Sequence, residues 1–206
     1  MTLLRKLELP LVLFLLTAGA AFLLKMCYLS LAVNCLFGLA FLTGFYFYVR
    51  ARHDINIPVM LMVLVFAALQ VDALGNYFHM YGRKFGPMQY DEFSHMAVQI
   101  LITPIIIWLV RRALDRLGHK VSLGIAALFA ITMMFSISAA YEIIELWDEV
   151  YFGGQRIWSK YDTANDLQWD LCGILIGTVL ALPLLRFAES KPLLRLSTQN
   201  TQASSS

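Results

Sequence analysis

Six long apolar runs constrain the fold of this chain more than any other feature of its sequence. They cover residues 9–24, 28–49, 57–77, 91–110, 121–147 and 166–185. A helix needs about 20 predominantly apolar residues to cross the hydrocarbon core of a bilayer, and most of the runs reach that length. The sequence therefore predicts an all-α, polytopic membrane protein with six transmembrane helices.

The connections between these runs are too short to hold a soluble domain, so we expect residues 1–190 to form a single six-helix membrane domain. The composition agrees, because 59% of the 206 residues are hydrophobic and 15% are charged. Soluble domains are roughly 45–50% apolar and about 25% charged. The first run is the shortest, which leaves a cleavable signal peptide open as an alternative. Residues 191–206, rich in Ser, Thr and Gln, are expected to form a disordered cytoplasmic tail.

The Lys and Arg residues divide unequally between the two sides of the predicted bundle. If the N-terminus is cytoplasmic, eleven lie on the inner side, namely Arg5, Lys6, Arg50, Arg52, Arg111, Arg112, Arg116, Lys120, Arg186, Lys191 and Arg195. Five lie on the outer side, namely Lys25, Arg83, Lys84, Arg156 and Lys160. Because cytoplasmic loops carry the excess of Lys and Arg, we expect both termini in the cytoplasm.

The acidic residues have the opposite distribution, with ten of the 14 in outer loops or outer helix ends. These ten are Asp72, Asp91, Glu92, Glu142, Glu145, Asp148, Glu149, Asp162, Asp166 and Asp170. A charge at the centre of a bilayer costs about 2.5–3.5 kcal/mol on insertion scales. Acids within or beside a span should therefore face the interior of the bundle, where they are candidates for function.

Spacings of three or four residues arrange these acids in stripes, each on one face of a helix. The stripes comprise Asp72 with Asn76, Asp91 with His95, Glu142 with Glu145, and Asp162 with Asp166 and Asp170. We expect the last three stripes to converge on one cavity in the outer half of the bundle. The predicted cavity is lined by Asp91, His95, Glu142, Glu145, Asp162 and Asp166.

Part of this pattern recurs 71 residues further along the chain. Tyr90-Asp91 corresponds to Tyr161-Asp162, His95 to Asp166, and Gln99 to Asp170. The two units run in the same direction through the membrane, so the sequence suggests a parallel two-helix repeat of helices 3–4 and 5–6. Sites in repeat-built membrane proteins lie at the repeat interface, where the two acidic stripes would face each other.

The outer acids exceed the outer bases by five formal charges, and clustered carboxylates recruit a cation or raise each other's pKa. Oxygen-rich sites suit Mg²⁺, Mn²⁺ or Ca²⁺, and one imidazole also admits Zn²⁺. A net charge of +2 provides no basic field for nucleic acid. A transport pathway and a purely structural hydrogen-bonded network remain open as alternatives to a cation site.

Three segments resemble known bacterial membrane proteins: 90–95 (YDEFSH), 141–145 (YEIIE) and 161–173 (YDTANDLQWDLCG). Together they resemble the YjdF-like family and, more distantly, VanZ-type proteins, whose pattern has Asn where this chain has Asp170. The resemblance covers about residues 72–185. It implies a multispan protein of the bacterial inner membrane, in a family with no established activity.

From these patterns we expect an outer-face, metal-assisted hydrolase or transferase acting on a lipid or on a lipid-linked head group. In this hypothesis Glu142, Glu145, Asp162 and Asp166 hold the cation. Asp91 and His95 form an acid–base pair, and a metal-bound water is the nucleophile. Asp72, Asn76 and Asp170 support the site. The alternatives are a cation- or proton-coupled transporter and a membrane assembly subunit with a structural polar core.

Overall fold

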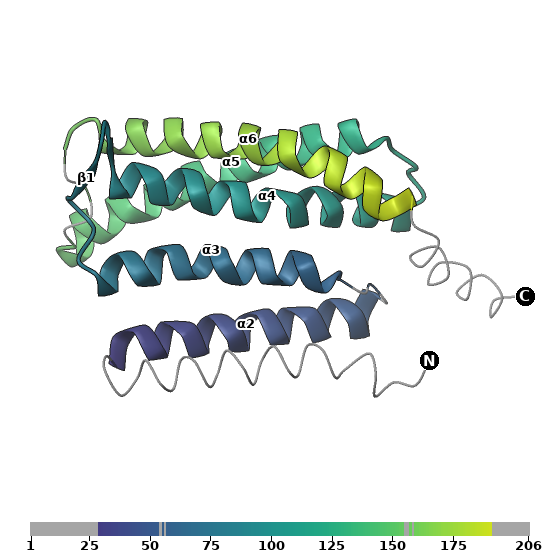
Figure 1. Ribbon diagram of the computed structural model, residues 1–206, viewed down its shortest axis with the longest axis horizontal. Coiled ribbons are helices and arrows are strands. Elements are labelled where there is room, and N and C mark those ends of the chain that lie inside the picture. The colour runs from purple at the N-terminus through teal and green to yellow at the C-terminus, as the bar shows by residue number, and fades with distance from the viewer. Residues whose placement is uncertain (1–28, 54, 56, 155–156, 158, 191–206) are drawn as a thin grey trace, which may run out of the picture.

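The computed structural model describes residues 29–53, 55, 57–154, 157 and 159–190 (Figure 1). Long helices form nearly all of this part of the chain: α2 (Leu29–His53), α3 (Val59–Tyr77), α4 (Tyr90–Arg116), α5 (Leu123–Trp147) and α6 (Asp162–Ser190). A short antiparallel hairpin of β1 (Lys84–Phe85) and β2 (Met88–Gln89) precedes α4. A π-helical turn, η1 (Asp148–Phe152), continues α5.

The all-α membrane class predicted from the apolar runs is confirmed. Four stretches of the described helices are long and apolar enough to cross a membrane: Met60–Tyr77, Tyr90–Arg116, Leu123–Phe152 and Asp162–Phe187. The run at 28–49 corresponds to the helix α2, which is not among these four. The run at 9–24 and the tail at 191–206 lie outside the described residues.

Helices α2, α4 and α6 extend beyond the apolar runs that predicted them, because a run ends at the first charged residues and a helix can continue through them. Helix α4 continues past residue 110 to Arg116. There the Arg112 guanidinium lies 5.6 Å from the centre of the Trp108 ring. Helix α6 begins at Asp162 instead of residue 166, since acidic side chains in a first turn interact favourably with the helix dipole. The hairpin was not predicted, and Gly86 enables its turn with a φ of 64°.

Helix α4 is central to the described bundle, in contact with α3, α5 and α6, while α2 packs on α3 (Figure 1). Glycines on α6 allow its close approach to α4. A Cβ atom at Gly173 would lie 2.4 Å from the Met96 carbonyl oxygen, and one at Gly177 would lie 2.9 Å from the Thr103 side chain. This close approach brings the polar side chains of α4 and α6 within reach of each other.

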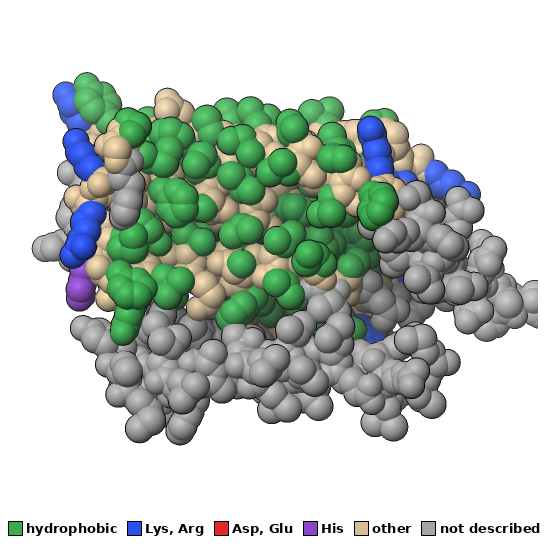
Figure 2. Space-filling model, viewed as in Figure 1, with side chains coloured by type: hydrophobic (Ala, Val, Ile, Leu, Met, Phe, Trp, Pro, Cys, Tyr) green, Lys and Arg blue, Asp and Glu red, His purple; other side chains and the backbone are tan. Residues whose placement is uncertain are grey.

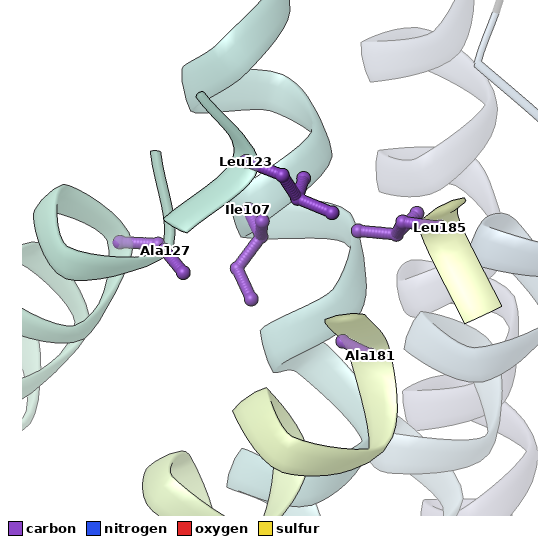
Figure 3. Packing of buried hydrophobic residues seen from close by; sticks show 6 residues of the cluster. Ile107, Leu123, Ala127, Ala181 and Leu185 are labelled. Carbon is purple, nitrogen blue, oxygen red and sulfur yellow. The ribbon is translucent and has the colours of Figure 1, made fainter. Parts of the chain in front are cut away.

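The end of the bundle opposite the hairpin has an apolar core. Six side chains from α4, α5 and α6 form it: Ile107, Leu123, Ala127, Ala130, Ala181 and Leu185. All of these except Ala130 are labelled in Figure 3. In Figure 2, hydrophobic side chains cover the middle of the face shown, and Lys and Arg gather at its two ends. No described Asp or Glu side chain shows on that face. This face is therefore suited to contact with lipid.

Candidate functional site

Helices α4 and α6 begin, and α5 ends, at the hairpin end of the bundle (Figure 1). The acidic stripes of these three helices meet there. A capping box fixes the start of α4, because the Gln89 backbone N–H donates to Glu92 Oε2 at 2.8 Å. The other oxygen, Glu92 Oε1, accepts a 2.9 Å hydrogen bond from Asn165 Nδ2 on α6. These two bonds hold the first turns of α4 and α6 together and so position the acidic residues within them.

His95 lies among three carboxylates. Its Nδ1 atom is 3.2 Å from Asp170 Oδ1, within hydrogen-bond distance. Its Nε2 atom is 3.9 Å from both Asp91 Oδ1 and Asp166 Oδ1, which is longer than a hydrogen bond. The Nδ1 edge of the imidazole therefore faces Asp170, and the Nε2 edge faces Asp91 and Asp166.

Glu142 on α5 is the most unusual carboxylate of the group. Its side chain is only 3% exposed, and Thr163 on α6 provides a side-chain hydrogen bond. The second oxygen, Oε1, is buried without a hydrogen-bond partner in the described structure. Leaving a buried polar atom without a hydrogen bond costs about 1–3 kcal/mol. A bound ligand or another compensating interaction at Glu142 Oε1 would offset this cost.

Two groups of side chains have the dimensions of a cation site. His95, Glu142 and Asp166 form the first group, and Asp91, Asp162 and Asp166 form the second. In each group the ligating atoms lie within 4.8 Å of one another. Metal–ligand bonds of about 2.0–2.4 Å allow two ligands of one ion to lie up to roughly 4–5 Å apart. Asp166 belongs to both groups.

The electrostatic surroundings of Asp166 are strongly negative. Its main charged neighbours are His95 and the carboxylates of Asp91, Glu142 and Asp162. Asp166 is 3% exposed, so water screens this repulsion poorly. One imidazole cannot balance so many carboxylates, and such a cluster is compensated either by protonation of a carboxyl group or by a cation.

The structure brings together most of the side chains that the sequence singled out. Glu145 lies within electrostatic range of Asp91 and Glu142 but is in neither cation-sized group. Asn76 on α3 is exposed and is likewise in neither group. The side chain of Asp72 lies outside the described part of the structure. Asp170, expected to support the site, contacts His95 directly.

Several polar neighbours escaped the sequence analysis. Thr163 contacts Glu142, and Ser138 accepts a 2.9 Å hydrogen bond from Gln99 Nε2. A usable signal existed for the second pair, because Gln99 follows His95 by four residues and Ser138 precedes Glu142 by four. Thr163 carries no such signal, since its contact depends on how α6 packs against α5.

Comparison with known proteins gives one result. A family model described as "Predicted membrane protein (DUF2238)" matches residues 9–191. No curated protein and no solved structure matches the chain.

Proposed function

We propose that this chain, which belongs to the DUF2238 family of predicted membrane proteins, is a metal-assisted hydrolase or transferase acting on a lipid or lipid-linked substrate. The observation that carries this proposal is the buried Glu142 Oε1 atom, which has no hydrogen-bond partner in the described structure. It belongs to a carboxylate that can share a cation with His95 and Asp166. Asp91 and Asp162, beside these buried groups, are partly exposed at the hairpin end of the bundle, where a head group could approach.

In this proposal His95 Nε2, Glu142 and Asp166 hold the cation. Asp170 orients the imidazole through Nδ1, as carboxylates commonly do behind metal-binding histidines. A nitrogen that binds a cation cannot also exchange a proton, so His95 serves as a ligand and not as the acid–base partner of Asp91. When bound, the cation would polarise the substrate and activate a water molecule. Glu145, expected from the sequence to be a fourth ligand, lies outside both groups and is not assigned to the cation in this proposal.

The membrane setting is part of the same proposal. The chain is a multi-pass protein of the bacterial inner membrane, with six spans in one domain, both termini cytoplasmic and the site toward the outer leaflet. The inner-side excess of Lys and Arg supports this orientation. The YjdF-like assignment rests on the motifs at 90–95, 141–145 and 161–173.

A parallel repeat of helices 3–4 and 5–6 also belongs to the proposal. Its support is the pairing of corresponding residues across α4 and α6. His95 lies 3.9 Å from its counterpart Asp166, and Asp91 shares a cation-sized group with its counterpart Asp162. A pseudo-twofold axis between α4 and α6 would relate these residues.

A cation- or proton-coupled transporter is the main alternative. Transport requires access from both sides of the membrane, and polar groups normally mark the route. The end opposite the hairpin is filled by the apolar side chains of Ile107, Leu123, Ala127, Ala130, Ala181 and Leu185 (Figure 3). This core favours a site open to one side only.

Cation binding is tested on the full-length protein purified in mild detergent. We expect the wild type to retain Mn²⁺ after desalting and to melt at a lower temperature in chelator. Asp166→Asn should lose both properties, whereas Asp115→Asn should keep them. Asp115 is a suitable control because it lies at the other end of α4, where its contact is Arg112 at 4.0 Å. Indifference of both wild type and Asp166→Asn to chelator would favour a structural polar network and overturn the cation.

The reaction is tested in proteoliposomes made from a bacterial lipid extract and supplied with Mn²⁺. Mass spectrometry of the lipids should reveal a species consumed by the wild type but not by Glu142→Gln. Radioactive Mn²⁺ in the same vesicles measures uptake. Uptake without lipid turnover would favour the transporter, and an unchanged lipid profile would contradict the hydrolase or transferase.

A further inference from the structure

The two cation-sized groups divide the predicted ligands in an informative way. Glu142 and Asp162 were expected to bind one ion, but the structure assigns them to different groups. Glu142 is grouped with His95 on the buried side. Asp162 is grouped with Asp91, and both are partly exposed. Asp166 is the member that the two groups share.

We propose that the site binds a pair of divalent cations bridged by the Asp166 carboxylate, an inference that rests on the proposed function. The inner cation takes His95 Nε2 and Glu142 as its further ligands. The outer cation takes Asp91 and Asp162. A carboxylate has two oxygens, so one Asp166 side chain can serve both ions.

The burial of Asp166 supports a bridging role. Its side chain is 5% exposed, and its oxygen Oδ1 lies 3.9 Å from His95 Nε2, too far for a hydrogen bond. Buried carboxylates are normally satisfied by hydrogen bonds, paired charges or metals. Coordination of the inner ion would satisfy Glu142 Oε1, which is buried without a hydrogen-bond partner in the described structure. Asp166 would supply one oxygen to each ion.

The charge of the site also fits two ions better than one. The two groups contain the four carboxylates of Asp91, Glu142, Asp162 and Asp166. With His95 neutral, a single divalent ion would leave these four carboxylates with a formal charge of about −2 in poorly screened surroundings, whereas two ions balance the four. Asp170, in contact with His95 Nδ1, adds one more negative charge. This balance distinguishes the pair from a single cation at the inner group.

The donor sets differ in the cations that they favour. The inner set contains an imidazole, which suits Zn²⁺ or Mn²⁺, and the outer set contains only carboxylates, which suit Mg²⁺, Ca²⁺ or Mn²⁺. Mn²⁺ is acceptable to both sets and is paramagnetic, which makes it the probe of choice. Hydrolases that use paired ions hold them about 3.5–4 Å apart, close enough for magnetic coupling.

The experiment measures Mn²⁺ stoichiometry and the electron paramagnetic resonance spectrum of the full-length protein in detergent. We expect the wild type to bind two Mn²⁺ per chain with a coupled spectrum that lacks the resolved hyperfine lines of an isolated ion. Asp162→Asn, changed at the first residue of α6, should bind one ion and restore those lines. Asp115→Asn should resemble the wild type in both measurements.

The outcomes separate this inference from the function on which it rests. One uncoupled Mn²⁺ in the wild type, lost in Glu142→Gln and unaffected by Asp162→Asn, would overturn the pair and leave the single-cation proposal standing. No Mn²⁺ in the wild type would overturn both. Two uncoupled ions would overturn the bridge. The wild-type measurement needs no variant, so a folding defect in Asp162→Asn cannot hide the result.

Discussion

The Nδ1 atom of His95 lies 3.2 Å from Oδ1 of Asp170, a contact that joins α4 to α6 within the buried part of the bundle. Asp170 is 4% exposed, so the bond is protected from competing water. The contact holds the Nδ1 edge of the ring against Asp170 and turns Nε2 toward Asp91 and Asp166. The ligand geometry of the proposed cation site depends on this one contact.

Replacing Asp170 should weaken cation binding in proportion to the loss of this hydrogen bond. Removing the partner behind a metal-binding histidine lowers affinity about 10–100-fold. Asp170→Asn keeps an acceptor oxygen and should lie near the lower figure, while Asp170→Ala should lie near the higher one. Equilibrium dialysis with Mn²⁺ measures both dissociation constants. Equal affinity in the wild type and Asp170→Ala would contradict the role of Asp170 in orienting His95 for cation binding.

Glu142→Gln and Glu145→Gln form a matched pair, because the same change is made one turn apart on α5. Ligand at 100 times its dissociation constant stabilises a protein by about 2.7 kcal/mol. The wild type and Glu145→Gln should gain this stability when Mn²⁺ is added, and Glu142→Gln should gain little. Thermal unfolding with and without Mn²⁺ measures the gain. A loss confined to Glu145→Gln would reverse the ligand assignment made here.

Gly173→Ala should destabilise the bundle and disturb the site. The new Cβ would lie 2.4 Å from the Met96 carbonyl oxygen and 2.8 Å from Gln99 Cβ. Overpacking of this kind costs about 1–3 kcal/mol, and separating α4 from α6 would also pull Asp170 from His95. The melting temperature and the affinity for Mn²⁺ should therefore both decrease.

Gly124→Ala on α5 is the control for that change. A Cβ there meets only the Ser122 Oγ atom at 3.9 Å, an ordinary contact. Stability should remain equal or rise slightly, because Ala favours helix more than Gly does. If Gly173→Ala were as stable as Gly124→Ala, this result would contradict the close packing of α4 on α6.

The proposed orientation has a direct test in living cells. A phosphatase fused at Ser206 should be inactive and a fluorescent protein fused there should be bright, because a cytoplasmic C-terminus follows from the Lys and Arg distribution. A phosphatase inserted at Gly153, the exposed glycine after η1 with a φ of 74°, should be active. The reverse pattern would move the site to the cytoplasmic side and exclude an outer-leaflet substrate.

The sequence by itself determined the membrane class, most helix positions and the side chains of interest. Long apolar runs predict transmembrane helices, since the backbone polar groups of a segment in lipid must form their hydrogen bonds within the segment. Spacings such as that of Asp91 and His95 place side chains on one helix face whatever the helix packs against. The bounds of α4 and α6 were harder to predict from the sequence, because both helices extend into polar residues.

Only the tertiary structure decided how the acidic residues are divided. Asp166 shares one group with Glu142 and another with Asp162, and Glu145 belongs to neither. The orphan oxygen of Glu142 and the Asp170 contact of His95 also depend on packing. Sequence periodicity gives the direction of a side chain around its own helix. The separation of atoms on different helices depends on how closely those helices approach, which Gly173 and Gly177 set for α4 and α6.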